Sequence, residues 1–190
     1  MTGDLEWRRL TEGLVCLALF TLTIPAANWL IGHVGTVCPP PHGPCLVPVA
    51  PGVMAPSGVL TIGLAFVLRD LVQRRLGAKV ALVAIVIGAF LSAWLAPPAI
   101  VLASTAAFLL SELADFAVYT PLQRRRLVLA VALSSLAGLV VGSFVFLWLA
   151  FGSLDHLTGQ IVGKAWMVLL ALPIVRWLRD RDARIGLTPA

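Results

Sequence analysis

Six apolar stretches, each long enough to cross a lipid bilayer, make up most of this chain. They lie at approximately residues 13–32, 53–71, 79–96, 99–120, 127–150 and 157–177. A bilayer-spanning helix needs about 20 such residues. Because 59% of the 190 residues are hydrophobic and only 12% are charged, too little polar surface remains to cover a water-soluble globule. The sequence therefore predicts an all-α integral membrane protein, with one domain over residues 1–190 and six transmembrane helices.

The loops between these stretches are short and contain residues that end helices. The breaks fall at the Pro-rich segment 38–51, at Gly77, at Pro97–Pro98, at Pro121 and at Gly152–Ser153. Such loops leave no room for an extramembrane domain, so we expect the function to be carried out within the membrane.

The distribution of positive charge predicts how the chain is oriented. All but one of the 14 Lys and Arg residues precede the first stretch or lie at or just beyond the ends of the second, fourth and sixth, and the exception is Lys164. Cytoplasmic loops of membrane proteins carry such an excess of Lys and Arg. We therefore expect six crossings of the plasma membrane (the inner membrane in a two-membrane cell), with both termini in the cytoplasm. The clustered Arg residues are interpreted as topology determinants, so no nucleic-acid partner is expected.

The first stretch could instead be a cleaved signal peptide. Arg8 and Arg9 would form its basic region, and Pro25 to Ala27 resemble a cleavage site. The apolar character continues through residues 29–31, however, and cleavage would leave five helices. A retained first helix is therefore favoured.

Two cysteines, Cys38 and Cys45, lie seven residues apart in the external loop CPPPHGPC. They could form a disulfide on the oxidising side of the membrane. Together with His33 and His42 they could instead hold a metal ion, but the spacing matches no common zinc pattern. A structural loop without metal is favoured, and no cofactor is indicated.

Ionisable residues inside the fourth and sixth stretches point to a functional site. Charged residues in a transmembrane helix usually face a partner or a water-filled cavity. Glu112 and Asp115 share one helical stripe with Thr105, Phe108 and Tyr119. Gln160 and Lys164 share a face of the sixth stretch at a similar depth. We expect the two carboxylates and Lys164 to meet in one mid-membrane cavity, although a buried structural ion network is an alternative.

Other polar or small residues receive weaker interpretations. Asp70 is expected to form a local helix pair with Arg74 at the cytoplasmic end. Asn28 follows Pro25 in the first stretch, and Gly138 and Gly142 form a G-x-x-x-G spacing typical of close helix packing. No motif of a known enzyme class occurs, so an enzyme acting on a lipid or small metabolite is the less economical interpretation.

Four segments resemble the queuosine precursor transporter family, also called the vitamin uptake transporter (VUT) family. They are GVLTIGLAFVLRDLVQRRLG (58–77), SELADFAVYTPLQRRR (111–126), SSLAGLVVGSFVF (134–146) and DHLTGQIVGKAWMVLLALP (155–173). The resemblance implies a six-helix carrier, similar to the substrate-binding subunits of energy-coupling-factor importers, that takes up 7-cyano-7-deazaguanine or a related 7-deazapurine.

The resemblance also implies the residues of the binding site. The expected substrate-binding residues are Asn28, Glu112, Asp115, Ser135, Gln160 and Lys164, with structural or gating roles for Asp70, Arg74 and Tyr119. Glu112 and Asp115 would read the donor edge of the ligand, while Lys164 would neutralise them or contact an acceptor. The chain departs from the family at Gly142, where members of the family resemble one another in carrying Asp.

Two modes of action are compatible with these features. The chain could be a carrier, by facilitated diffusion or by proton coupling through one of the carboxylates. Alternatively it could be a vitamin- or purine-binding subunit that needs an ATP-driven partner to translocate its ligand. The sequence leaves the oligomeric state open, a homo-oligomer included.

Overall fold

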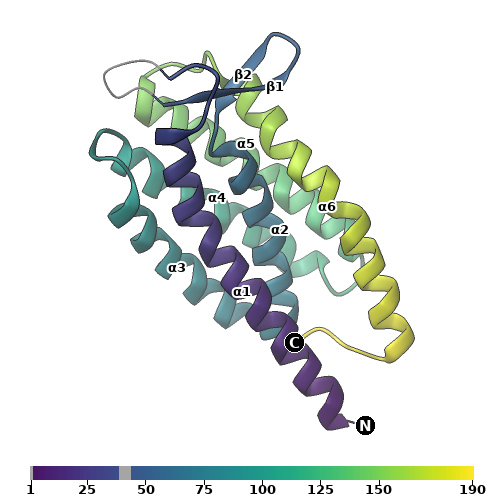
Figure 1. Ribbon diagram of the computed structural model, residues 1–190. Coiled ribbons are helices and arrows are strands. Elements are labelled where there is room, and N and C mark those ends of the chain that lie inside the picture. The colour runs from purple at the N-terminus through teal and green to yellow at the C-terminus, as the bar shows by residue number, and fades with distance from the viewer. Residues whose placement is uncertain (1, 39–43) are drawn as a thin grey trace.

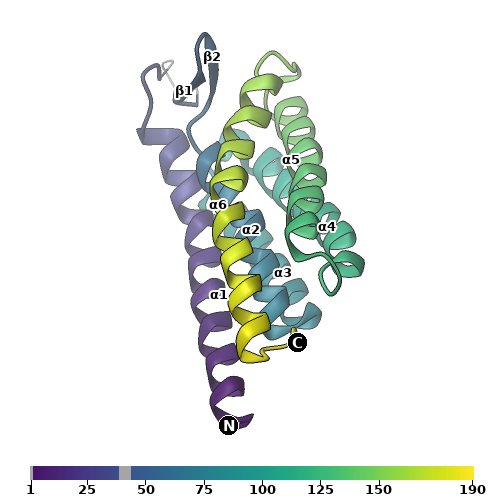
Figure 2. The ribbon, with the colours of Figure 1, turned by 90° about the vertical axis from the view of Figure 1, so that its right-hand side faces the viewer.

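The computed structural model describes residues 2–38 and 44–190 as a bundle of long α-helices, in which both termini lie at the same end (Figures 1 and 2). The helices are α1 (Thr2–His33), α2 (Val59–Leu76), α3 (Ala78–Leu95), α4 (Val101–Leu122), α5 (Leu127–Phe151) and α6 (Leu157–Ile185). A short 3₁₀ helix, η1 (Pro98–Ile100), precedes α4. Two antiparallel strands, β1 (Leu46–Ala50) and β2 (Val53–Pro56), cover the end of the bundle opposite the termini (Figure 1).

The predicted boundaries of α3, α4 and α5 are correct to within two residues. By contrast, α1 begins at Thr2 rather than near residue 13, and α6 continues to Ile185 rather than ending near residue 177. The additional turns are polar, so hydropathy alone could not include them. They extend the two helices beyond the apolar layer, where their charged residues contact each other.

The prediction of helix from residue 53 onward is wrong, because residues 53–56 form strand β2. Pro51 and Gly52 make the turn of a hairpin, with Gly52 in the left-handed region at a φ of 71°. The hairpin pairs Leu46 with Pro56. It is attached to α6 because the Trp166 Nε1–H donates to the carbonyl of Val49 at 3.0 Å.

Helix α2 is enclosed by the rest of the bundle. Five helices, α1, α3, α4, α5 and α6, are long and apolar enough to cross a membrane, whereas α2 carries Arg69, Asp70, Arg74 and Arg75. It contacts each of the other five helices and is buried over most of its length. A helix surrounded by protein needs no apolar surface, so its polar composition follows from its central place. The sixth crossing thus stays a prediction.

The outer helices present large apolar side chains to their surroundings. Phe90 and Trp94 of α3 are 73% and 83% exposed, and Leu102 of α4 is 72% exposed. In water such a surface would drive association, but in a bilayer it meets acyl chains. The exposed apolar belt and the five apolar helices together identify a multi-pass membrane protein.

Glycines allow close contact between neighbouring helices, as the G-x-x-x-G spacing predicted. A Cβ at Gly138 would lie 3.0 Å from the carbonyl oxygen of Ser111, and a Cβ at Gly142 would lie 2.8 Å from the Ser111 Cβ. Gly63 of α2 similarly lies directly against the backbone of Lys164 on α6. Without side chains at these positions, α5 packs closely on α4, and α6 on α2.

Two cysteines at the hairpin end of the bundle form a disulfide, Cys38–Cys45. The bridge, which the sequence left as a possibility, excludes these two sulfurs as thiolate ligands of a metal. His42, which belonged to the metal alternative, lies outside the described residues. Among the residues that are described, no group of three or more His, Cys, Asp or Glu side chains is arranged to hold a metal ion.

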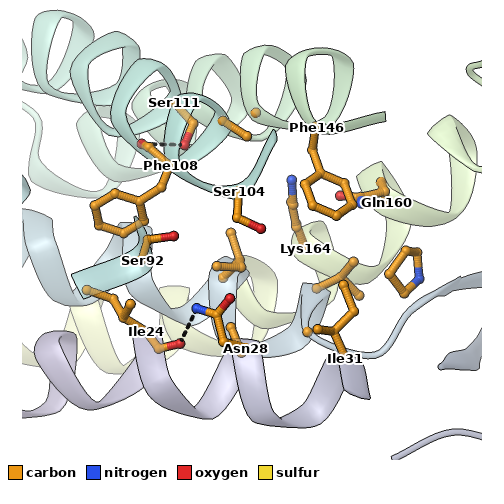
Figure 3. Close-up of a pocket in the computed structure, with 17 residues that line it drawn as sticks. Ile24, Asn28, Ile31, Ser92, Ser104, Phe108, Ser111, Phe146, Gln160 and Lys164 are labelled. Atoms are coloured by element: carbon orange, nitrogen blue, oxygen red, sulfur yellow. Dashed lines mark hydrogen bonds between the residues drawn. The ribbon is translucent and has the colours of Figure 1, made fainter. Parts of the chain in front are cut away.

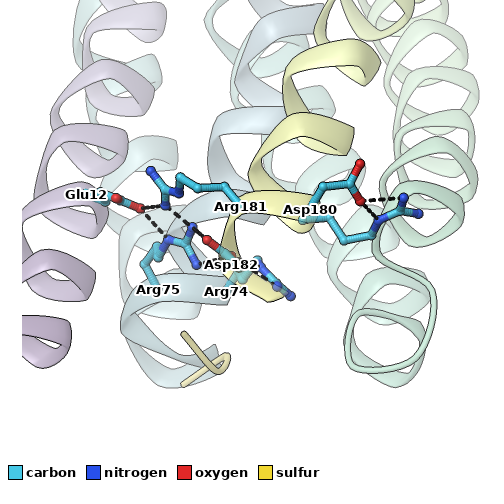
Figure 4. A network of polar contacts seen from close by, with 7 residues as sticks. Glu12, Arg74, Arg75, Asp180, Arg181 and Asp182 are labelled. Atoms are coloured by element: carbon cyan, nitrogen blue, oxygen red, sulfur yellow. Dashed lines mark hydrogen bonds and ion pairs between the residues drawn. The ribbon is translucent and has the colours of Figure 1, made fainter. Parts of the chain in front are cut away.

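An ionic network joins α1, α2 and α6 near the chain termini (Figure 4). Asp182 of α6 is 1% exposed and accepts two hydrogen bonds from Arg75, at 2.8 and 2.9 Å, and one from Arg74 Nη2 at 3.2 Å. Glu12 of α1 accepts from Arg75 Nε at 3.0 Å and from Arg181 at 2.7 Å. These contacts hold three helices together at this end of the bundle.

This network corrects the prediction of a local pair between Asp70 and Arg74. Arg74 pairs with Asp182 of α6, whereas Asp70 is fully buried beside Arg69. Arg74 thus pairs with Asp182, more than 100 residues away in the sequence, and not with Asp70, four residues away, because α6 packs against α2.

Replacing Asp182 with Asn should destabilise the bundle by about 3 kcal/mol or more, because the buried Arg74 and Arg75 lose their shared counter-charge. Asp180→Asn is the matched control, because the Arg179–Asp180 pair is about half exposed and such pairs contribute less than about 1 kcal/mol. The measurement is the fraction of detergent-solubilised protein that stays folded on heating, read by size-exclusion chromatography. Equal thermal stability of the two variants would show that the network does not hold the helices.

Candidate functional site

A partly enclosed pocket lies between the helices, in the half of the bundle nearer the hairpin (Figure 3). It contains about 80 Å³ of free volume, enough for several water molecules. All six α-helices and strand β2 contribute to its wall. The lining residues are Ile24, Ala27, Asn28, Ile31, Pro56, Gly58, Val59, Ile62, Ser92, Ser104, Ala107, Phe108, Ser111, Gly142, Phe146, Gln160 and Lys164.

The wall of the pocket is mainly apolar, with a few polar groups at separate points. Phe108 and Phe146 supply aromatic surface, and aliphatic side chains from α1 and α2 supply most of the rest. The polar groups are three serines, two amides and one ammonium: Ser92, Ser104, Ser111, Asn28, Gln160 and Lys164. An apolar wall with a small number of polar groups is typical of small-molecule sites.

Lys164 is the one ionisable residue in this lining, and it is 4% exposed. Its Nζ donates to Ser143 Oγ at 3.0 Å, and no carboxylate of the described residues lies within 4 Å. Figure 3 shows its side chain directed into the pocket. A buried ammonium is costly unless a negative or strongly accepting group approaches it, so the pocket favours a ligand that offers one.

Two side-chain amides complete the polar lining. Asn28 Nδ2 donates to the carbonyl of Ile24 at 2.9 Å, and its Oδ1 faces the pocket (Figure 3). Gln160 lies one turn before Lys164 on α6 and is 3% exposed. The structure thus brings together three of the residues predicted to bind substrate: Asn28, Gln160 and Lys164.

Glu112 and Asp115 do not line the pocket, so the expected cavity shared with Lys164 is not formed. The predicted stripe on α4 is real, because Phe108, Glu112, Asp115 and Tyr119 are all buried. After Phe108 along the chain, however, this stripe faces α2, and the carboxylates of Glu112 and Asp115 form ion pairs with Arg69. The cation for these carboxylates therefore comes from α2 and not from α6.

Arg69 lies at the centre of a fully buried ion cluster. Its Nη2 contacts both Asp70 Oδ1, at 2.9 Å, and Asp115 Oδ1, and its Nε contacts Glu112 Oε2 at 3.3 Å. Its Nη1 donates to Gln73 Oε1 at 2.9 Å. None of these five side chains is more than 1% exposed. We call Arg69, Asp70, Glu112 and Asp115 the Arg69 cluster.

The remaining predicted site residues also lie outside the pocket. Asp70 accepts a hydrogen bond from Ser134 Oγ at 3.0 Å, and the ring of Tyr119 lies 5.5 Å from the Arg69 guanidinium carbon. Ser135, the neighbour of Ser134, is buried without lining the pocket. Asp70 is thus part of the Arg69 cluster and Tyr119 lies against it, whereas Arg74 belongs to the network of Figure 4.

Sequence reasoning missed Arg69, which it counted as a cation at the membrane surface. The available signal was the charge density of α2, since a transmembrane helix with four charged residues must be enclosed by protein. It also missed the pocket serines Ser92 and Ser104, because isolated serines in apolar helices are common and give no distinctive pattern.

The absence of a side chain at Gly142 keeps the wall of the pocket in its place. Gly142→Ala should destabilise the protein by about 1–3 kcal/mol, since the added Cβ would lie 2.8 Å from the Ser111 Cβ. Ser111→Gly removes that obstacle, so the double variant should recover part of the loss. The measurement is thermal stability of the two single variants and the double variant; additive losses would contradict this contact.

Comparison with known proteins gives one match. Residues 94–178, which include all of α4 and α5 and the apolar part of α6, match the family model described as "Putative vitamin uptake transporter". No curated protein and no solved structure matches the chain.

Proposed function

This chain belongs to the vitamin uptake transporter family through residues 94–178, and we propose that it imports a small heterocyclic nutrient through the pocket that contains Lys164. The observation that carries the proposal is the buried Lys164, which is hydrogen-bonded to Ser143 but contacts no carboxylate of the described residues, in a mainly apolar pocket to which all six helices contribute. Because transport requires a site that opens to one side at a time, a pocket formed between helices can change its access when they shift.

Within this function we propose 7-cyano-7-deazaguanine or a related 7-deazapurine as the ligand, following the resemblance of the four sequence segments. The ring carbonyl and the nitrile of this base are acceptors on one edge, where the Lys164 ammonium could donate to both. The opposite edge carries donors that suit the amide oxygens of Asn28 and Gln160. Phe108 or Phe146 could cover its flat face. In this arrangement the amide oxygens of Asn28 and Gln160 accept hydrogen bonds from the donor edge of the ligand, a role that the sequence analysis assigned to Glu112 and Asp115.

The proposed orientation has six membrane crossings, with both termini and the network around Asp182 on the cytoplasmic side. The asymmetry of Lys and Arg supports it, as does the disulfide at the opposite end, where an oxidising compartment would maintain it. In this orientation the pocket lies in the outer half of the membrane, and the ionic contacts lie between it and the cytoplasm.

Purified protein in proteoliposomes should take up radiolabelled 7-cyano-7-deazaguanine, and Lys164→Met should lower its affinity by about 10- to 100-fold. This range corresponds to the loss of one hydrogen bond to a charged group. Lys79→Met is the matched control, because Lys79 is exposed at the start of α3. Equal affinity of the two variants would contradict a contact between Lys164 and the ligand.

The charge of Lys164 should also select between related ligands. We expect the neutral cyano compound to bind at least about 10-fold more tightly than its 7-aminomethyl counterpart, whose ammonium would repel that of Lys164. Equilibrium binding of both compounds to wild-type protein and to Lys164→Met measures the difference. The preference should shrink in the variant, and an unchanged preference would assign the discrimination elsewhere.

The alternative is a binding subunit that docks on an ATP-driven partner, as the resemblance to energy-coupling-factor subunits implies. The same proteoliposomes separate the two, because a carrier moves ligand into vesicles without any other protein. Ligand binding without accumulation would favour the subunit.

A further inference from the structure

The Arg69 cluster contains more acid than its single cation can balance. Asp70, Glu112 and Asp115 are each at most 1% exposed, and all three contact the one guanidinium of Arg69. With every carboxylate ionised, the cluster would hold an uncompensated charge of −2 inside a membrane protein. Excess buried charge is expensive, and neighbouring carboxylates avoid it by retaining a proton.

Other groups near the cluster do not supply the missing positive charge. Lys164 on α6 is bound to Ser143, and Arg74 and Arg75 on α2 are bound to Asp182. Helix α5 contributes Ser134 and the backbone at Gly138, neither of which is charged. Among the described residues, Arg69 is therefore the one cation in contact with these three carboxylates.

Three buried oxygens beside Arg69 have no hydrogen-bond partner in the described part of the chain. They are Asp70 Oδ1, which forms an ion pair with Arg69 Nη2 at 2.9 Å, Asp115 Oδ2, on the carboxylate that shares this nitrogen, and the hydroxyl of Tyr119, whose ring lies over Arg69. Buried polar atoms are nearly always satisfied. A proton on one of these carboxylate oxygens would reduce the charge excess and turn that oxygen from an acceptor into a donor.

The cluster lies next to the pocket on the same helix. Ser111 and Phe108 line the pocket, and Asp115 and Glu112 follow them by four residues, or about 6 Å along the axis of α4. Gly142 of α5 lies at the pocket, while a Cβ added at Gly138, one turn away, would lie 3.1 Å from the Asp115 Cβ. A movement of α4 against α5 that opens the pocket would therefore also change the surroundings of Asp115.

From this geometry we propose that the Arg69 cluster is a proton-binding site, with Asp115 and Asp70 sharing the proton, and that its loading and release are coupled to ligand transport. The coupling rests on the proposed import function, whereas the bound proton does not. During uptake, the proton would enter from the outer side with the ligand and leave toward the cytoplasm, so that the carboxylates alternate between protonated and ionised forms.

The bound proton is tested without any ligand. Infrared spectra of the purified protein at neutral pH should contain the carbonyl band of a protonated carboxylic acid, shifted in D₂O, and Asp115→Asn should remove or displace it. Asp155→Asn, in the exposed external turn, is the control that should leave the band unchanged. Absence of the band from the wild-type protein would overturn the proposal.

Coupling is tested in proteoliposomes. An inward proton gradient should accelerate uptake of 7-cyano-7-deazaguanine and acidify the lumen of wild-type vesicles, while Asp115→Asn should bind the ligand but lose both responses. Wild-type uptake without response to the gradient would overturn the coupling. If the proposed import function is wrong, the result is distinguishable from a failure of the coupling. The ligand would then neither bind to the protein nor enter the vesicles, while the infrared band of the protonated carboxylic acid would remain.

Discussion

The ion pairs between Arg69 and the carboxylates of α2 and α4 are the constraint on which the rest of the bundle depends. Four ionisable side chains in the interior of a membrane protein require that protein, not lipid, surround them on every side. Helix α2 meets this requirement because the other five helices enclose it. Each outer helix can then present apolar side chains to the bilayer and a polar or small-residue face to the centre.

Three polar layers follow one another along the bundle. The pocket around Lys164 lies nearest the hairpin, the Arg69 cluster follows it on α4, and the network of Asp182 lies near the termini. Glycines at positions 63, 138 and 142 bring the helices of the first two layers into close contact. Helix α2 takes part in all three layers, and α6 takes part in the first and the third, so a shift of α6 against α2 that opens the pocket must also strain the network of Asp182.

The separation of charge between these layers changes the chemistry expected of the pocket. With Glu112 and Asp115 engaged by Arg69, the pocket wall has one positive charge and no carboxylate. Under the proposed function, ligand recognition favours acceptors near Lys164, and the proposed proton site uses the carboxylates. The departure at Gly142 agrees with close packing of α5 on Ser111, since an aspartate there would meet the Ser111 side chain.

The sequence by itself determined the membrane location, the extent of α3, α4 and α5, and the buried stripe on α4, whereas it left the bridge between Cys38 and Cys45 as a possibility. These features depend on local composition and spacing, since hydropathy and helical periodicity act over neighbouring residues. Only the tertiary structure decided which charges pair. Lys164 and Arg69 were equally available to Glu112 and Asp115, and the choice followed from the packing of α2 between α4 and α6, which no local pattern encodes. Residues 53–56 form a strand and not a helix because they pair with residues 46–50 across a turn. Pro51 and Gly52 are residues typical of such a turn.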